Sequence, residues 1–193
     1  MKILLAITGA SGSIYGLRLL EELLQGGHQV TLVSSESGLK VCRFETGIEL
    51  DNADTLKQQW HLPKASLTIR AADDLWAPEA SGSAASDAMI IAPCSMGTLG
   101  RISAGISSNL IERAADVLLK ENRPLLLVPR ETPFSAIHLE NLLKLSRCGA
   151  RIIPAMPAFY QKPESVAELV NFVVGKVLDQ LGVEHNLFKR WGE

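Results

Sequence analysis

The stretch Lys2–Gly16, KILLAITGASGSIYG, decides the fold. An apolar run passes at once into small residues from Gly9 to Gly12, and leucines then recur at intervals of three and four positions. This order predicts a buried parallel strand, a tight turn and a helix that ends at Gly26-Gly27. A second apolar strand is expected over Gln29–Val33, so the segment is predicted to form a strand–helix–strand unit.

The turn after the first strand has backbone N–H groups without helical partners, and the helix dipole favours an anion there. The glycines at positions 9, 12 and 16 do not match the dinucleotide-binding pattern G-x-G-x-x-G, and the stretch contains no Gly-Lys-Ser/Thr of a P-loop. The turn alone therefore leaves two interpretations open. It either holds a phosphate or other polar ligand, or it is a plain tight turn.

Composition restricts the class of protein. A length of 193 residues predicts one domain, residues 1–193, with ample chain for a core. A net charge of -2 with scattered basic residues argues against a general nucleic-acid binder. Three cysteines without a C-x-x-C motif suggest reduced thiols and a cytoplasmic setting. No run of 18 apolar residues occurs, so no membrane span is expected.

Further apolar runs predict the rest of the sheet. Buried strands are expected over Ala88–Ala92 and Pro124–Val128, a short edge strand over Leu67–Arg70 and a last one over Arg151–Ile153. Pro93 is expected to stop its strand. Helical patterns lie between these strands, so the sequence predicts a three-layer α/β sandwich with a mostly parallel sheet and helices on both faces.

Small and polar residues follow two of the strands. Ser35 follows the second strand, where it either only caps the next helix or also meets a ligand. Ser95, Gly97 and Thr98 follow the strand that begins at Ala88. Two such turns favour a ligand across the carboxyl ends of the strands, where open parallel sheets form their crevice. Cys94 is interpreted as a buried thiol, because no nearby histidine supports a nucleophile.

Arg130 and Glu131 stand side by side after the strand Pro124–Val128, between Pro129 and Pro133. Arginine suits a phosphate through paired hydrogen bonds, and a glutamate with a tuned pKa transfers protons. The alternative is an ordinary ion pair at the entry of a helix.

Charged residues on three expected helices are further candidates. Asn109 and Glu112 fit a capping box. Arg113 and Lys120 share one helix face, which is otherwise a solvated face with an Asp116–Lys120 pair. Glu45 lies near the end of the helix expected over residues 38–46, where the dipole does not favour a negative charge, although a solvated glutamate also explains it.

Six ordered motifs, with the chain's last four residues, resemble those of the UbiX-type flavin prenyltransferases over essentially the whole chain. The motifs are Thr8-Gly9-Ala10-Ser11-Gly12, Ala92-Pro93-Cys94-Ser95, Asn109–Asp116, Leu118–Glu121, Pro129–Pro133 and Pro157-Ala158-Phe159-Tyr160, and the ending is Arg190-Trp191-Gly192-Glu193.

The resemblance implies a flavodoxin-like fold and a defined reaction. Reduced FMN would be prenylated at N5 and C6 by dimethylallyl monophosphate, without a metal, and the prenylated FMN would pass to a UbiD-type decarboxylase. The FMN-binding residues carried over by motif are Gly9, Ala10, Ser11, Ser35, Ser95, Met96, Gly97, Thr98 and Arg130.

The residues expected around the dimethylallyl phosphate are Lys120, Arg130, Glu131, Tyr160, Lys176, Arg113 and Trp76. Lys176 stands where the family often has arginine, and Trp76 is equally well explained as an interface residue. Glu131, Ser11 and Glu45 are the candidates for catalysis. The resemblance also implies a homododecamer built from trimers, with sites at subunit interfaces.

Two other functions remain open at this point. One is an FMN-dependent decarboxylase of aromatic or peptidyl-cysteine acids, although the segment Pro93-Cys94-Ser95-Met96 lacks the asparagine of the related cysteine decarboxylases. The other is a flavin carrier without catalytic activity.

Overall fold

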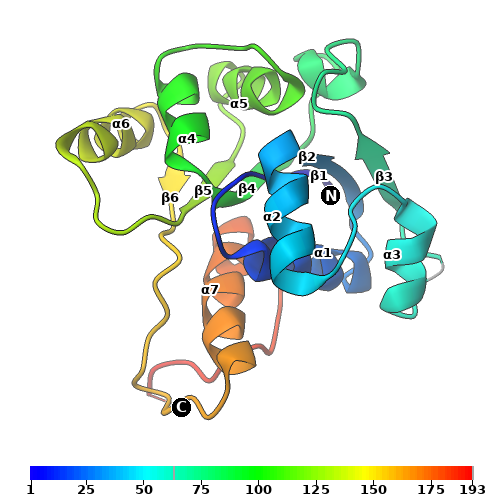
Figure 1. Cartoon of the computed structure of the whole chain (residues 1–193), viewed down its shortest axis with the longest axis vertical. Helices are drawn as coiled ribbons and strands as arrows, with labels where there is room; N and C mark the ends of the chain where they lie inside the picture. Colours follow the sequence, from blue (N-terminus) through cyan, green and yellow to red (C-terminus); the bar gives the residue numbers. More distant parts are fainter. Residues whose placement is uncertain (63, 193) are drawn as a thin grey trace.

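A computed structural model describes residues 1–62 and 64–192, so Glu193 of the terminal motif lies outside the described residues. A six-stranded sheet in the order β3-β2-β1-β4-β5-β6 forms its centre, and all its pairs are parallel (Figure 1). The strands are β1 (Lys2–Ile7), β2 (Gln29–Ser34), β3 (Leu67–Arg70), β4 (Ala88–Cys94), β5 (Leu125–Pro129) and β6 (Arg151–Ile152).

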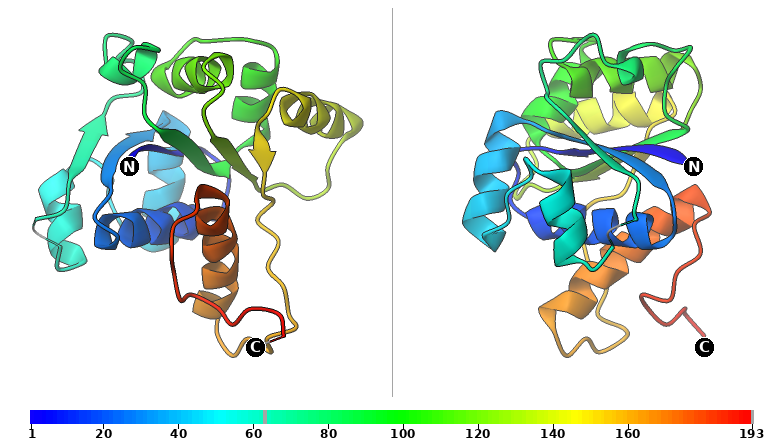
Figure 2. Two further views of the ribbon diagram at one scale, coloured as in Figure 1. Left: turned by 180° about the vertical axis from the view of Figure 1, so that it is seen from behind. Right: turned by 90° about the vertical axis from the view of Figure 1, so that its right-hand side faces the viewer.

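Helices cover both faces of the sheet, which confirms the α/β sandwich (Figures 1 and 2). The helices are α1 (Ser13–Gln25), α2 (Glu36–Thr46), α3 (Ala53–Gln59), α4 (Met96–Ser103), α5 (Leu110–Lys120), α6 (Ala136–Arg147) and α7 (Val166–Leu181), with a short 3-10 turn η1 (Pro78–Ala80). Alternate residues of β1 point to opposite faces: Leu5 packs in the core that contains α1 and α7, and Leu4 in the core that contains α4 and α5.

The strand order reverses beside β1. The chain moves outward from β1 through β2 to β3 and then returns to the other side of β1 with β4. The loops after β1 and β4 therefore diverge over opposite faces, which opens a crevice at the carboxyl edge of the sheet.

The prediction that Pro93 stops its strand is wrong. Strand β4 runs through Pro93 to Cys94, which pairs with Pro129 of β5 after a register shift that begins at Ile91. Proline, which has no N–H to donate, is tolerated here because the ladder is irregular at this point, and its carbonyl oxygen still accepts hydrogen bonds from Thr8.

Two helices begin elsewhere than expected. Helix α2 begins at Glu36, two residues early, because Ser35 caps it by accepting a hydrogen bond from the Gly38 N–H at 3.0 Å. Helix α7 begins at Val166, two residues after the start at Glu164 that the apolar pattern predicts, because Ser165 caps it by accepting a hydrogen bond from the Glu168 N–H.

Helix α1 packs closely on β4 through Gly16. A Cβ atom at this position would lie far inside van der Waals contact with the carbonyl oxygen of Ala92 and also close to the Ile7 side chain. The helix thus approaches the sheet at the strand end beside the crevice only because this residue has no side chain.

We expect Gly16→Ala to lower the free energy of unfolding by about 1–3 kcal/mol, because backbone atoms must move to admit the methyl group. Chemical denaturation measures this change. The matched control is Gly100→Ala in α4, where the added Cβ would lie 3.5 Å from the nearest atom, a nitrogen of Asn141, and should not destabilise. Equal effects of the two substitutions would contradict the role of close packing at Gly16.

Candidate active site at the carboxyl edge of the sheet

The buried hydroxyl of Thr8 joins the loops that follow β1 and β4. Its backbone N–H and its Oγ1 both donate to the carbonyl oxygen of Pro93, at 3.2 and 2.8 Å. The same Oγ1 accepts a hydrogen bond from the backbone N–H of Ser95 at 2.8 Å. The two loops are therefore fixed to each other at the point where the strand order reverses.

Arg130 adds the loop after β5 to this junction. Its Nε donates to the carbonyl oxygen of Ser11 at 2.9 Å, and its backbone N–H donates to Cys94 at 3.4 Å. Its two terminal guanidinium nitrogens donate to no other residue in the part of the chain that the structure describes. The structure thus brings Ser11, Ser95 and Arg130, three predicted FMN-binding residues, to one edge. The terminal guanidinium nitrogens of Arg130 remain available there as charged hydrogen-bond donors.

Helix α4 begins at this edge. Ser95 caps it: its Oγ accepts from the Thr98 N–H at 3.3 Å and donates to the Thr98 Oγ1 at 3.1 Å. The predicted FMN-binding residues Met96, Gly97 and Thr98 form the first turn of the helix. A helix N-terminus of this kind presents N–H groups and a positive partial charge to an anion.

The first and second loops lie against each other at Gly9. A Cβ atom at Gly9 would collide with the side chain of Ser37, whose Oγ lies 3.2 Å from that of Ser35. The capping role of Ser35 is confirmed, and its contact with a ligand stays a prediction.

The N-terminus of α1 already has an anion of its own. Glu45 accepts hydrogen bonds from the N–H groups of Gly12, at 3.0 and 3.1 Å, and of Ser13 at 2.9 Å. Partial burial raises the pKa of this carboxyl, but hydrogen bonds from Ser11, Ser13 and Gly12 outweigh it and hold the pKa below its usual range. The misfit of Glu45 at the end of α2 is thus explained by its contact with the start of α1.

Glu131 makes no ion pair with Arg130. Its Oε1 accepts from the N–H of Thr132 at 3.0 Å, while Arg130 turns to Ser11. The interpretation as an ordinary ion pair at a helix entry is therefore wrong. Glu131 is partly exposed at the same edge, directly beside Arg130.

The predicted site residues of α5, Arg113 and Lys120, contact residues that do not belong to this junction. Arg113 donates to the carbonyl oxygen of Ala80 at 3.0 Å and pairs with Asp116 at 2.9 Å. Lys120 pairs with Glu121, so the expected Asp116–Lys120 pair is wrong, because Arg113 reaches Asp116 first.

Trp76, which precedes η1, is another candidate outside the junction. It is 98% exposed, the largest exposure of any large apolar side chain in the described chain. Its indole ring therefore has almost no partner within one chain.

Tyr160 and Lys176 lie on the side of α7. The Tyr160 ring packs edge-on against Phe172 and Trp191, with centroids 5.9 and 4.9 Å apart. Lys176 Nζ lies 3.8 Å from Asp179 and 5.7 Å from the centre of the Phe188 ring. A hollow of about 490 Å³ opens here, lined by Tyr160, Gln161, Lys189, Arg190, Trp191 and Gly192.

Apart from Trp76, the predicted site residues thus fall into three groups. The flavin-binding residues, Glu45 and Glu131 gather at the carboxyl edge. Arg113 and Lys120 lie with α5 on one face of the sheet, and Tyr160 and Lys176 lie with α7 on the other (Figure 1). No hydrogen bond or ion pair links these groups within residues 1–62 and 64–192.

Cys94 has the properties of a structural thiol. It is fully buried, and burial raises its pKa to about 12, so it is not a nucleophile near neutral pH.

No group of three His, Cys, Asp or Glu side chains that could hold a metal ion occurs in the described residues. No helix in that part of the chain is long and apolar enough to cross a membrane.

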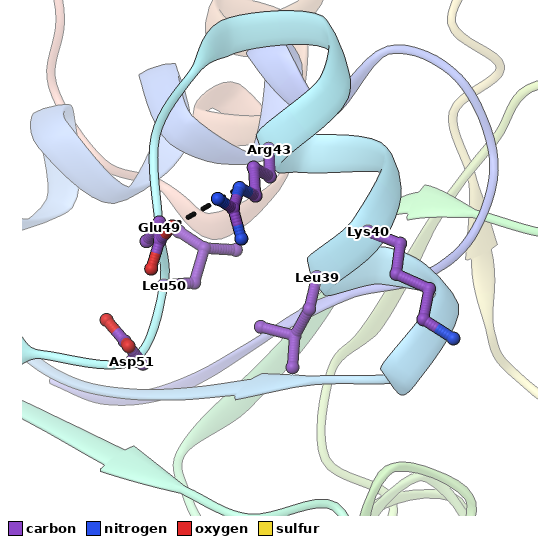
Figure 3. Close-up of a pocket in the computed structure, with 6 residues that line it drawn as sticks. All are labelled: Leu39, Lys40, Arg43, Glu49, Leu50 and Asp51. Atoms are coloured by element: carbon purple, nitrogen blue, oxygen red, sulfur yellow. Dashed lines mark ion pairs between the residues drawn. The ribbon is translucent and has the colours of Figure 1, made fainter.

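A second hollow, of about 180 Å³, lies beside α2 and is lined by Leu39, Lys40, Arg43, Glu49, Leu50 and Asp51 (Figure 3). The Arg43–Glu49 ion pair at 3.3 Å spans it. None of the predicted site residues lines this hollow, so we do not assign the active site to it.

Because the folded state lowers the pKa of Glu45, its stabilising effect is complete above the unfolded-state value of about 4.3 and disappears as pH falls through the lower folded-state value. We expect Glu45→Gln to lower Tm at pH 7 and to reduce the loss of Tm on acidification below about pH 5. Thermal melts across pH measure both effects. The control Glu49→Gln should keep the acid sensitivity of the unmodified chain, and an unchanged acid slope in Glu45→Gln would contradict the assignment.

Comparisons with known proteins agree with this geometry. A family model described as flavoprotein matches residues 1–178. The flavin prenyltransferase UbiX of Halalkalibacterium halodurans is 53% identical over 188 residues, which cover 97% of this chain and 91% of the relative.

Two solved structures also resemble this chain over its whole length. A crystal structure of AnUbiX (PadA1) in complex with FMN and dimethylallyl pyrophosphate has a TM-score of 0.91 and 40% identity, covering 97% of that chain. A dodecameric FMN-dependent UbiX-like decarboxylase from Escherichia coli O157:H7 has a TM-score of 0.90 and 43% identity, covering 100% of that chain. By sequence, fold and the arrangement of its carboxyl edge, this chain belongs to the flavoprotein family and, within it, to the UbiX-type flavin prenyltransferases.

Proposed function

We propose that this chain binds reduced FMN at the carboxyl edge of its sheet and transfers a dimethylallyl group to N5 and C6 of that flavin. One observation carries the proposal: Ser11, Ser95 and Arg130 converge where the strand order reverses, in a chain 40% identical to one solved with FMN and dimethylallyl pyrophosphate. The spare guanidinium nitrogens of Arg130 and the start of α4 suit the acceptor oxygens of a flavin phosphate.

The chain's own groups suit the breaking of an allylic C–O bond. That step needs positive charge and hydrogen-bond donors on the departing phosphate, and shelter from water. Lys120, Arg113, Tyr160 and Lys176 supply such groups. Glu131, partly exposed beside Arg130, is placed to hold or move a proton at the edge. FMN supplies the ring that is alkylated.

We further propose that neighbouring chains complete the site, because one chain holds the three groups of residues apart. Helix α6 exposes an apolar surface to support such contacts: Ile137 is 68%, Leu139 54% and Leu143 51% exposed. A relative 43% identical is dodecameric, and we propose the same assembly for this chain.

The donor, the receiving partner and the compartment are proposed as well. We favour dimethylallyl monophosphate as the donor, a UbiD-type decarboxylase as the receiver of prenylated FMN, and the cytoplasm as the location. The three thiols, Cys42, Cys94 and Cys148, are all free, as a reducing compartment requires.

The function is tested by mixing the purified protein anaerobically with reduced FMN and each of two donors, dimethylallyl monophosphate or pyrophosphate, and weighing the released flavin by mass spectrometry. We expect a flavin heavier by one five-carbon unit with the monophosphate, and none without protein. An unchanged flavin with both donors would contradict the proposal and favour flavin carriage or decarboxylation.

We expect Glu131→Gln to retain FMN while its rate of prenylation falls by about 100-fold or more, because the amide cannot accept a proton. Single-turnover kinetics measure the rate, and FMN titration measures binding. Glu21→Gln, on the outer part of α1, is the matched control and should keep the normal rate. Normal turnover by Glu131→Gln would remove its role in proton transfer.

We expect Lys176→Ala to raise the donor KM by about 10-fold or more and to leave FMN affinity unchanged. The substitution removes a positive charge expected beside the dimethylallyl phosphate and leaves the flavin-binding residues intact. Steady-state kinetics and FMN titration separate the two effects. A loss of FMN binding in this variant would show that the assignment of the α7 side to the donor is wrong.

A further inference from the structure

Thr98 has its hydrogen-bonding role set by two donors. Its side chain is buried, with only 3% of the residue exposed, at the start of α4. Its Oγ1 accepts from Ser95 Oγ at 3.1 Å and from a terminal nitrogen of Arg101 at 3.3 Å. A hydroxyl has two acceptor lone pairs and one O–H, so with both lone pairs used Thr98 has only its O–H left, as a donor. No described residue accepts that hydrogen bond.

Arg101 is in turn held by a buried carboxylate. Its Nε donates to Glu112, whose side chain is completely buried, while the Arg101 side chain is 46% exposed. The second oxygen of Glu112 accepts from the N–H of Ser108 at 2.9 Å. A buried carboxylate is costly unless it is paired, so Glu112 strongly favours the arginine orientation that the structure shows.

This arrangement departs from the capping box expected at the start of α5. Asn109 does cap the helix, accepting from the Glu112 N–H at 3.0 Å. The Glu112 side chain does not return to Asn109 but reaches Ser108 and Arg101, because the end of α4 lies beside the start of α5. The buried glutamate therefore connects α5 to Arg101 in the last turn of α4, and Arg101 reaches back to Thr98 in the first turn.

We infer that Arg101, fixed by Glu112, is a positioning residue that makes Thr98 an obligatory hydrogen-bond donor to an acceptor oxygen of the flavin. The inference rests on the proposed function, because it requires flavin at this edge. It assigns to Arg101 no direct contact with the flavin. Its effect on binding passes through the Thr98 hydroxyl.

A double-mutant cycle on the intact protein tests this inference. FMN is titrated by flavin fluorescence into the unmodified chain, Arg101→Met, Thr98→Val and the double variant. We expect each single substitution to weaken FMN binding about 10-fold, and the double variant to bind no more weakly than Thr98→Val alone. A merely structural arginine would not show this dependence on Thr98.

Arg18→Met is the matched control. Arg18 pairs with Glu21 and Glu22 on α1, outside the edge, and its loss should leave the Kd for FMN unchanged. Circular dichroism confirms that each variant is folded. Riboflavin, titrated in parallel, identifies the acceptor: a loss confined to FMN assigns it to the phosphate, and a loss shared by riboflavin assigns it to the ring or ribityl chain.

Two results would overturn the inference. Unchanged FMN affinity in Arg101→Met, or losses that multiply in the double variant, would show that Arg101 does not act through Thr98. Absence of FMN binding by the unmodified chain would instead refute the proposed function and this inference with it. FMN binding by the unmodified chain therefore distinguishes a failure of the proposed function from a failure of the role of Arg101.

Discussion

The hydrogen bonds of Thr8 are the constraint on which the site depends. A hydroxyl that donates to Pro93 and accepts from Ser95 satisfies buried groups of two diverging loops at once. It fixes the carboxyl ends of β1 and β4 at the point where the strand order reverses. The turn that contacts Arg130 and the cap of α4 are both positioned by these hydrogen bonds. Loss of the Thr8 hydroxyl would therefore displace the hydrogen-bond donors at the edge.

Charge is distributed around this joint in a consistent way. Glu45 occupies the amides at the start of α1, which leaves the start of α4 and the Arg130 guanidinium as the positive groups at the edge. A flavin phosphate placed there would meet hydrogen-bond donors on the side of β4 and β5 and a carboxylate on the side of α1. Electrostatics therefore favour a ligand whose anionic group points toward β4 and β5 and away from Glu45.

Much of the fold was predictable from the sequence, because apolar runs and small-residue turns carry local signals. The strands from Gln29, Leu67 and Ala88 begin where those signals place them, and the turns after β1 and β4 do lie together at the edge. The strand through Pro93 was not predictable, since proline is tolerated there by an irregular pairing between β4 and β5, which lie far apart in the chain.

The missed parts of the site share one physical cause. Thr8, Arg101 and Glu112 act through side-chain contacts between separate segments of the chain, which leave no periodic pattern in the sequence. The contact of Glu45 with α1 is of the same kind. The donor-binding roles of Tyr160 and Lys176, by contrast, rest on the family resemblance, and a single chain does not bring these residues to the edge.

We propose that a complete site takes its edge from one chain and its donor-binding cations from another. Co-expression of Glu131→Gln and Lys176→Ala chains with different affinity tags, followed by isolation of assemblies that carry both tags, tests it most directly. The kcat/KM for the donor should recover to about a quarter of the normal value per site, the fraction of sites that receive both intact residues by random mixing. Hybrid assemblies whose kcat/KM stays at the mean of the two parent variants would instead show that Glu131 and Lys176 serve a site within one chain, and would contradict this proposal.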